Sequence, residues 1–98
     1  MNRPRLKLGD VVHVTRLRRK AVDAWGVIIP SALGTFDEDQ PDILWLAIDS
    51  CIPGWGALAV GKAWWVNTYG DEDFWTVPDE LPQHLWPLLA RYKMTGAL

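Results

Sequence analysis

Short apolar segments, each bounded by turn residues, constrain the fold of this chain more than any other feature of its sequence. Residues 11–15, 25–29, 43–48, 63–69 and 74–77 are rich in β-branched and aromatic side chains, and Gly, Pro and charged residues separate them. Segments of this length and spacing in a short chain are typical of antiparallel sheets. The sequence therefore predicts about five short antiparallel strands that form a small barrel or a rolled sheet.

Two of these segments indicate which faces are buried. Alternation over residues 11–15 places Val12 and Val14 on one face and His13 and Thr15 on the other. The run "ILWLAIDS" (residues 43–50) is apolar almost throughout, which indicates a central strand covered on both faces, although a short helix fits the same pattern.

The connections between the segments are less uniform. The basic stretch "RLRRKAVDA" (residues 16–24) is interpreted as a loop that either extends the first hairpin or crosses to the second strand. The acidic stretch at residues 31–42 contains Gly34 and Pro41 and is predicted to be a surface loop. Residues 63–69 and 74–77, joined by a Gly and three acids, are predicted to pair as an antiparallel hairpin.

The period of the apolar residues changes near the C-terminus. Spacings of three and four residues predict one face of a helix, formed by Leu85, Leu88, Leu89 and Tyr92. We expect this helix to span residues 84–95, with Pro87 tolerated in its first turn and Gly96 ending it. The whole chain, residues 1–98, is predicted to be a single domain of the mainly β (α+β) class, with residues 1–5 as a flexible arm.

The order "LKLGDVVHV", basic loop, "WGVIIP", acidic loop, "ILWLAID" resembles the opening of Src homology 3-like small barrels. That family often begins with a strand introduced by a Gly-Asp turn and followed by a long first loop. The likeness covers residues 6–50. It implies a binding module more than an enzyme, although a fold alone does not establish a function.

Charge is distributed unevenly along the chain. Residues 1–20 hold seven of the ten basic residues and one acid, whereas residues 21–90 hold eleven acids and one base. The formal net charge is -2. An acidic balance of this kind disfavours binding to the phosphate backbone of nucleic acid.

The sequence also indicates a compartment. Cys51 is the one cysteine, so an internal disulfide is excluded, which fits a reducing environment. The charged N-terminal segment lacks the apolar core of a signal peptide, and no apolar run approaches the roughly 20 residues that span a bilayer. We expect a cytoplasmic protein that does not contact a membrane.

Candidate catalytic groups are isolated in the sequence. His13, His84 and Cys51 have no recognised catalytic motif around them. The acidic runs at residues 37–42 and 71–73 lack the ligand spacing of a calcium loop. We therefore expect no catalytic residue, no metal site and no cofactor.

The seven tryptophans carry the strongest functional indication. We expect Trp25 and Trp45 in the core, Trp75 stacked across the predicted hairpin, and Trp86 anchoring the helix to the sheet. Because neighbours on a strand point to opposite faces, one of Trp64 and Trp65 faces outwards, where it is either covered by the helix or exposed. Trp55, between Gly54 and Gly56, is either a lid over the core or a contact residue.

Three functions fit these observations. The preferred hypothesis is a protein-binding module, such as an inhibitor or accessory subunit encoded by a phage or mobile element. The module would be a monomer or a homodimer. Its contact residues would be Trp55, Trp64, Trp65, Tyr69, Asp71, Glu72 and Asp73. The first alternative is a nucleic-acid-binding barrel that uses exposed Trp with Arg16, Arg18, Arg19 and Lys20. The second is a domain that binds a small nucleotide-like ligand.

Overall fold

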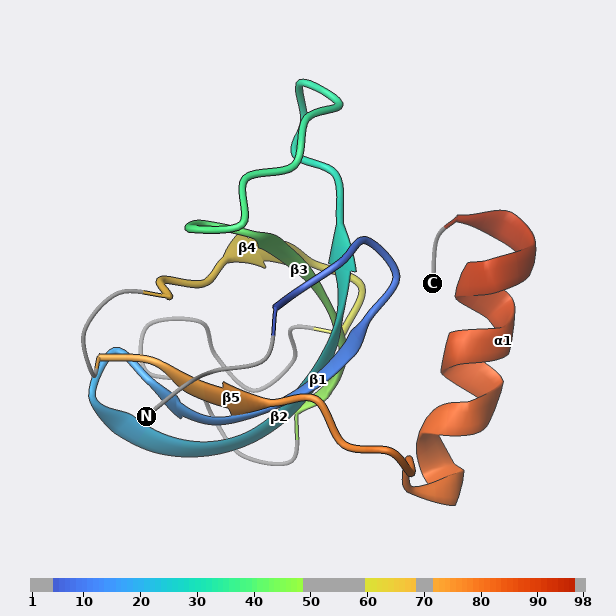
Figure 1. The fold of residues 1–98 in the computed structure, drawn as a ribbon. Coiled ribbons are helices and arrows are strands. Elements are labelled where there is room, and N and C mark those ends of the chain that lie inside the picture. The colour runs from blue at the N-terminus through green and yellow to red at the C-terminus, as the bar shows by residue number, and fades with distance from the viewer. Residues whose placement is uncertain (1–4, 49–59, 69–71, 97–98) are drawn as a thin grey trace.

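The computed structural model describes residues 5–48, 60–68 and 72–96. Within these residues, five strands form one antiparallel sheet, and a short 3-10 helix leads into an α-helix (Figure 1). The elements are β1 (Val11–Leu17), β2 (Lys20–Ile29), β3 (Asp42–Ile48), β4 (Ala63–Trp65), β5 (Phe74–Thr76), η1 (Gln83–Leu85) and α1 (Trp86–Thr95). The predicted fold, mainly β with a C-terminal helix, is confirmed.

A tight turn at Gly9 introduces β1, as the sequence predicts. Gly9 has a φ of 89°, in the left-handed region that favours glycine. Its N–H donates to the carbonyl of Ile28 at 2.9 Å, and the Asp10 carboxylate accepts from the Lys7 N–H at 2.9 Å. The second bond closes the turn and the first ties it to β2, and in the strand that follows, Val12 and Val14 are fully buried on one face.

The strand order in the sheet is β4-β3-β2-β1-β5. The predicted hairpin between the segments of β4 and β5 is therefore wrong, since the two strands lie at opposite ends of the order. β4 pairs with β3, and β5 pairs with β1. Both are three residues long, and each adds to a longer strand that is already anchored in the sheet. Trp75 accordingly lies opposite Val14 and does not stack across a hairpin.

The connection between β1 and β2 is a two-residue turn, not a long basic loop. β1 ends at Leu17 and β2 begins at Lys20, with Arg16 paired to Ala21. Of the two alternatives for residues 16–24, the segment extends the first hairpin. Exposed basic side chains are compatible with strand structure here because only alternate residues of a strand need to face the core.

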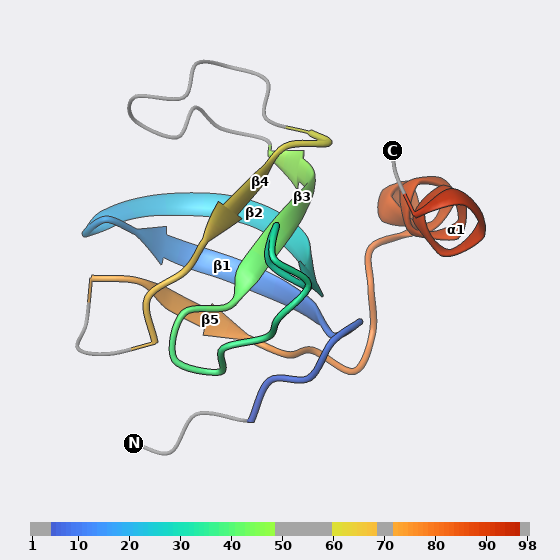
Figure 2. The same ribbon diagram turned by 90° about the horizontal axis from the view of Figure 1, so that it is seen from above.

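The sheet is covered on both faces, since strand alternation sends successive side chains to opposite sides. An inner cluster on the concave side contains Leu6, Val12, Val14, Leu17, Val22, Ala24, Ile28, Ile43, Trp45, Val66 and Trp75. A helix cluster on the other side contains Trp25, Val27, Leu46 and Leu85, and Figure 2 shows α1 outside the curved sheet. Trp25 and Trp45 are core residues, as expected, and β3 contributes to both clusters.

The helix packs through the face that the sequence predicts. Leu85 is fully buried, and Leu88, Leu89 and Tyr92 pack against the helix cluster. Trp86 does not anchor the helix, because it is 54% exposed. One residue along a helix turns the side chain by about 100°, so burying Leu85 directs Trp86 away from the sheet.

Gly26 lies at a bulge in β2 where the neighbouring strand approaches closely. The register between β2 and β3 shifts between Trp25 and Gly26, and such bulges bend a strand. A Cβ atom on Gly26 would overlap Cγ2 of Ile43 and lie 3.1 Å from the carbonyl oxygen of Leu44. The missing side chain is thus what lets β3 approach β2 this closely.

Candidate functional site

The turn between β1 and β2 holds two arginines in an uncommon backbone conformation. Arg18 and Arg19 have φ values of 52° and 68°. The left-handed region costs a residue with a Cβ about 1–2 kcal/mol, and two-residue turns of this kind usually carry Asn-Gly or Gly-Gly. Such strain persists only where the surrounding structure holds it, and it concentrates at functional sites. The β1–β2 turn and the residues that contact it are therefore the candidate functional site.

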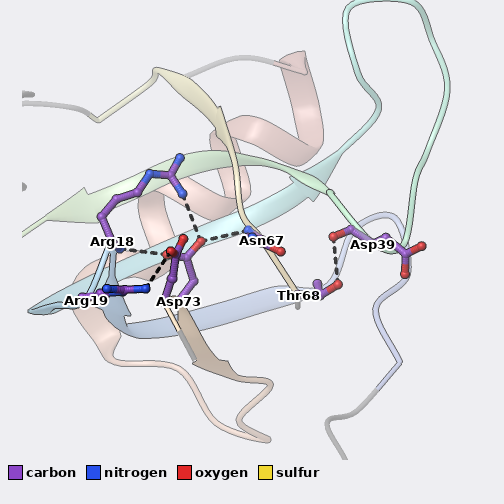
Figure 3. Close-up of polar contacts among 7 residues, drawn as sticks. Arg18, Arg19, Asp39, Asn67, Thr68 and Asp73 are labelled. Carbon is purple, nitrogen blue, oxygen red and sulfur yellow. Dashed lines mark hydrogen bonds and ion pairs between the residues drawn. The ribbon is translucent and has the colours of Figure 1, made fainter. Parts of the chain in front are cut away.

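Asp73 holds the turn in place from inside the protein. Its side chain is 0% exposed, and its two carboxylate oxygens accept hydrogen bonds from Arg18 and Asn67 (Figure 3). The donors are the Arg18 N–H at 2.8 Å, the Arg18 Nη1 at 3.2 Å and the Asn67 N–H at 2.9 Å. One buried carboxylate thus joins the β1–β2 turn, the segment that follows β4 and the segment that precedes β5.

Glu72 adds a second, more exposed connection to the same turn. The Arg19 N–H donates to the Glu72 carbonyl at 2.7 Å, and Arg19 Nη2 lies 3.3 Å from Glu72 Oε1. An ion pair between exposed groups contributes at most about 1 kcal/mol. The backbone bond is therefore the part of this connection that positions the turn.

Two tryptophans of the edge strand β4 lie beside Arg18. Trp64 is 41% and Trp65 39% exposed, and neither belongs to a core cluster. The guanidinium carbon of Arg18 lies 4.4 Å from the ring centroid of Trp65 and 5.9 Å from that of Trp64. Both distances are within the range of a cation–π interaction. We call these two rings and the Arg18 guanidinium the Trp–Arg surface.

The structure places residues of two predicted sites side by side. Trp64, Trp65 and Glu72 belong to the predicted protein-binding patch. Arg18 and Arg19 belong to the alternative nucleic-acid site, which also uses exposed Trp. The expectation that one of the two Trp faces outwards is correct only in part, because both are exposed and the next residue, Val66, is the buried one. Arg16 and Lys20, the other two basic candidates, are exposed on the strands that flank the turn.

Some predicted contact residues are either buried or outside the described residues. Asp73 cannot contact a partner, because its buried carboxylate is occupied by donors from within the chain. An acid run in a sequence gives no sign of which member turns inwards. Trp55, Tyr69 and Asp71 lie outside the described residues, as does Cys51.

Sequence reasoning missed the contact that organises the site. Arg18 and Asp73 are 55 residues apart, and no local pattern links them. It also missed that His13 stacks on Trp25, with ring centroids 4.2 Å apart and an interplanar angle of 4°. His13 Nε2 lies 2.6 Å from Asp23 Oδ1. These contacts give His13 a structural role on the outer face of the sheet, and alternation within β1 and β2 would have indicated it once their register was known.

Two further properties concern the described part of the chain as a whole. In residues 5–48, 60–68 and 72–96, no group of three His, Cys, Asp or Glu side chains is placed to hold a metal ion. Over the same residues, no helix combines the length and the hydrophobicity that crossing a bilayer requires.

The strain in the turn predicts a stability difference between two variants of Arg19. Arg19→Gly and Arg19→Ala both remove the exposed ion pair, but only Gly adopts a positive φ without steric cost. We expect Arg19→Gly to be about 1 kcal/mol more stable than Arg19→Ala in urea denaturation. Equal stabilities would contradict a left-handed conformation at this position.

The Arg18–Asp73 contact and the two exposed Trp rings are the features from which a function can be inferred. Comparison with known proteins assigns no family: no family model, curated protein or solved structure matches the chain.

Proposed function

We propose that this chain is a non-catalytic protein-binding module and that the Trp–Arg surface is its contact site. The observation that carries the proposal is the exposure of two neighbouring Trp rings, 41% and 39%, on an edge strand. Grouped apolar side chains at a protein surface mark interaction sites more often than chance. Trp and Arg are also the residue types most enriched among those that dominate interface energies.

The position of β4 supports the same proposal. β4 lies at the end of the sheet order, and among the described residues it pairs with β3 alone. The outer edge of such a strand presents backbone N–H and C=O groups that an extended segment of another protein can pair with. An added strand at this edge would run beside the rings of Trp64 and Trp65.

The size of the domain is consistent with an accessory role. A chain of 98 residues in which we assign no catalytic residue suits an inhibitor or accessory subunit that docks on a larger complex in the cytoplasm. The resemblance to Src homology 3-like barrels favours a binding module in the same way. Origin in a phage or mobile element is part of this proposal.

A second candidate function is favoured by one observation, the placement of Arg18 over exposed Trp rings. Single-stranded nucleic acid binds to surfaces where bases stack on aromatic rings and basic side chains contact phosphates. The eleven acids among residues 21–90 oppose the approach of a polyanion. Fluorescence anisotropy with a 20-nucleotide oligothymidylate at low salt tests this candidate, and an absence of binding excludes it.

Affinity purification tests the main proposal. Tagged wild-type protein is expected to recover a stoichiometric partner from a lysate of the source organism, and Trp64→Ala/Trp65→Ala is expected to lose it. The double variant should remain folded, because surface substitutions and a lost cation–π contact together cost about 1–2 kcal/mol. Circular dichroism checks the fold of each variant.

Trp86→Ala is the matched control, since Trp86 is a third exposed Trp but lies on the helix, outside the Trp–Arg surface. It should recover the partner as the wild type does. The proposal fails if wild-type protein recovers no stoichiometric partner, or if the double variant retains it.

A further inference from the structure

Arg18 is held more firmly than most surface arginines. Its Nη1 lies 3.2 Å from the buried Asp73 carboxylate, and its own backbone N–H donates to the same carboxylate at 2.8 Å. The guanidinium carbon also lies 4.4 Å from the ring centroid of Trp65. The backbone, one end of the fork and the face of the fork are therefore all positioned before any partner arrives.

The other end of the Arg18 fork meets no acceptor among residues 5–48, 60–68 and 72–96. A guanidinium carries five N–H donors, and Asp73 accepts from the Nη1 group. Figure 3 shows the second terminal nitrogen directed away from Asp73. The side chain is 36% exposed, and among the described residues no other group accepts a hydrogen bond from it.

We propose that Arg18 is the specificity-determining residue of the Trp–Arg surface, and that it binds a carboxylate on an extended segment of the partner protein that lies along the edge of β4. This inference rests on the proposed function and names the chemistry of the partner. A planar fork with free parallel N–H groups matches the two oxygens of a carboxylate. Because the fork is already fixed, binding requires little further ordering of the side chain.

The charges around the site also favour an acidic segment. Lys62 directly precedes β4, and Arg16 and Lys20 flank the turn that carries Arg18. Of the two described acids at the site, Asp73 is buried and Glu72 is paired with Arg19. A segment with one or two carboxylates therefore meets a locally basic surface.

A peptide fits this surface better than a nucleic acid for two reasons. The edge of β4 that no described strand covers offers hydrogen bonds that match an extended peptide backbone. A polyanion would carry charge well beyond the basic turn and meet the acids that dominate residues 21–90. Salt screens such repulsion only beyond about 10 Å at ordinary ionic strength.

Selection from a displayed library of random 12-residue peptides tests the inference. Wild-type protein is the bait, and Trp64→Ala/Trp65→Ala is the counter-bait that removes peptides bound elsewhere. We expect the enriched peptides to share an Asp or Glu at a fixed position. Replacing that residue by Asn or Gln in a synthetic peptide should weaken binding to wild-type protein about ten-fold or more, as expected for a lost charge-assisted hydrogen bond.

The protein variants provide the complementary arm. Arg18→Gln should weaken the binding of the selected peptides to a similar degree. Arg19→Gln is the matched control and should change peptide affinity less than about two-fold, the small effect typical of contacts outside a hot spot. Arg19 lies in the same turn and carries the same charge, but its guanidinium pairs with Glu72 and not with the Trp rings. Amide replacement in the peptide leaves the protein intact, so the test stands even if Arg18→Gln folds poorly.

Other outcomes would contradict the role of Arg18, the protein-binding proposal, or both. Enriched peptides that need the two Trp but show no acid preference would overturn the role of Arg18 and leave the protein-binding proposal in place. No enrichment over the counter-bait would overturn both. Oligothymidylate that binds more tightly than the selected peptides, and loses binding in Trp64→Ala/Trp65→Ala, would overturn both in favour of nucleic acid.

Discussion

Replacing Asp73 with alanine is expected to lower the free energy of unfolding by about 3–5 kcal/mol. The substitution removes the acceptor of the hydrogen bonds from Arg18 and Asn67 and leaves Arg18 without its buried partner. It also removes the contact that holds Arg18 at a positive φ. Because small domains are stable by only about 5–15 kcal/mol, this loss is a large fraction of the total.

Chemical denaturation followed by Trp fluorescence measures the effect, and two variants bracket it. Asp73→Asn keeps the shape and one acceptor oxygen, so its loss should be smaller than that of Asp73→Ala. Glu72→Ala removes the neighbouring exposed ion pair and should cost at most about 1 kcal/mol. Equal losses for Asp73→Ala and Glu72→Ala would mean that Asp73 does not join the three segments.

Gly26→Ala is expected to produce the second large effect, a loss of about 3 kcal/mol, at the upper end of the range for overpacked cores. The new methyl group would overlap Cγ2 of Ile43, which is buried in the inner cluster, and it would also approach the backbone of β3. Neither neighbour can move without disturbing the pairing of β2 with β3. Gly34→Ala is the control, because nothing lies within 4 Å of that position and the cost arises from its positive φ of 78° alone.

Second-site variants of Ile43 separate a local clash from a general loss of packing. Ile43→Val retains Cγ2, so its effect should add to that of Gly26→Ala. Ile43→Ala removes Cγ2, so the double variant should lose less stability than the sum of the two single variants. Additive losses in both combinations would show that the clash with Ile43 is not the cause.

The parts of the fold that sequence predicted depend on local patterns. Alternation was sufficient for Val12 and Val14, which are both buried in the inner cluster. Helical spacing was sufficient for the packed face of α1, and Gly96 ends that helix with a φ of 73°, as its position predicts. In each case the property lies within one element and does not require knowledge of a distant neighbour.

The predictions that failed required such knowledge. A turn signal between two aromatic segments is compatible with a hairpin, but it is also compatible with a connection that carries the chain to the far edge of the sheet. The outcome depends on which strand edges are left unpaired in the β1–β2–β3 sheet. β4 pairs with the edge of β3 and β5 with the edge of β1, and these edges exist only once the sheet has assembled. Trp86 is the exception, because the helical spacing that places Leu85 on the packed face turns the next residue about 100° away from it. The expectation that Trp86 anchors the helix did not follow that spacing.

The residues of the candidate site were predicted, but the contact that joins them was not. Exposed Trp was combined with the basic residues in the nucleic-acid alternative, whereas the preferred protein-binding patch left the arginines out. Their meeting depends on Asp73, which the sequence places among three consecutive acids with nothing to distinguish it. Strand pairing is what brings them together.

The long separation between Arg18 and Asp73 has a consequence for the protein while it is being synthesised. A ribosome releases Arg18, Trp64 and Trp65 before Asp73 can leave the exit tunnel and fold. Until then, nothing holds the arginine fork against the rings. The Trp–Arg surface therefore cannot form until Asp73 is available, although Arg18 and both rings are synthesised earlier.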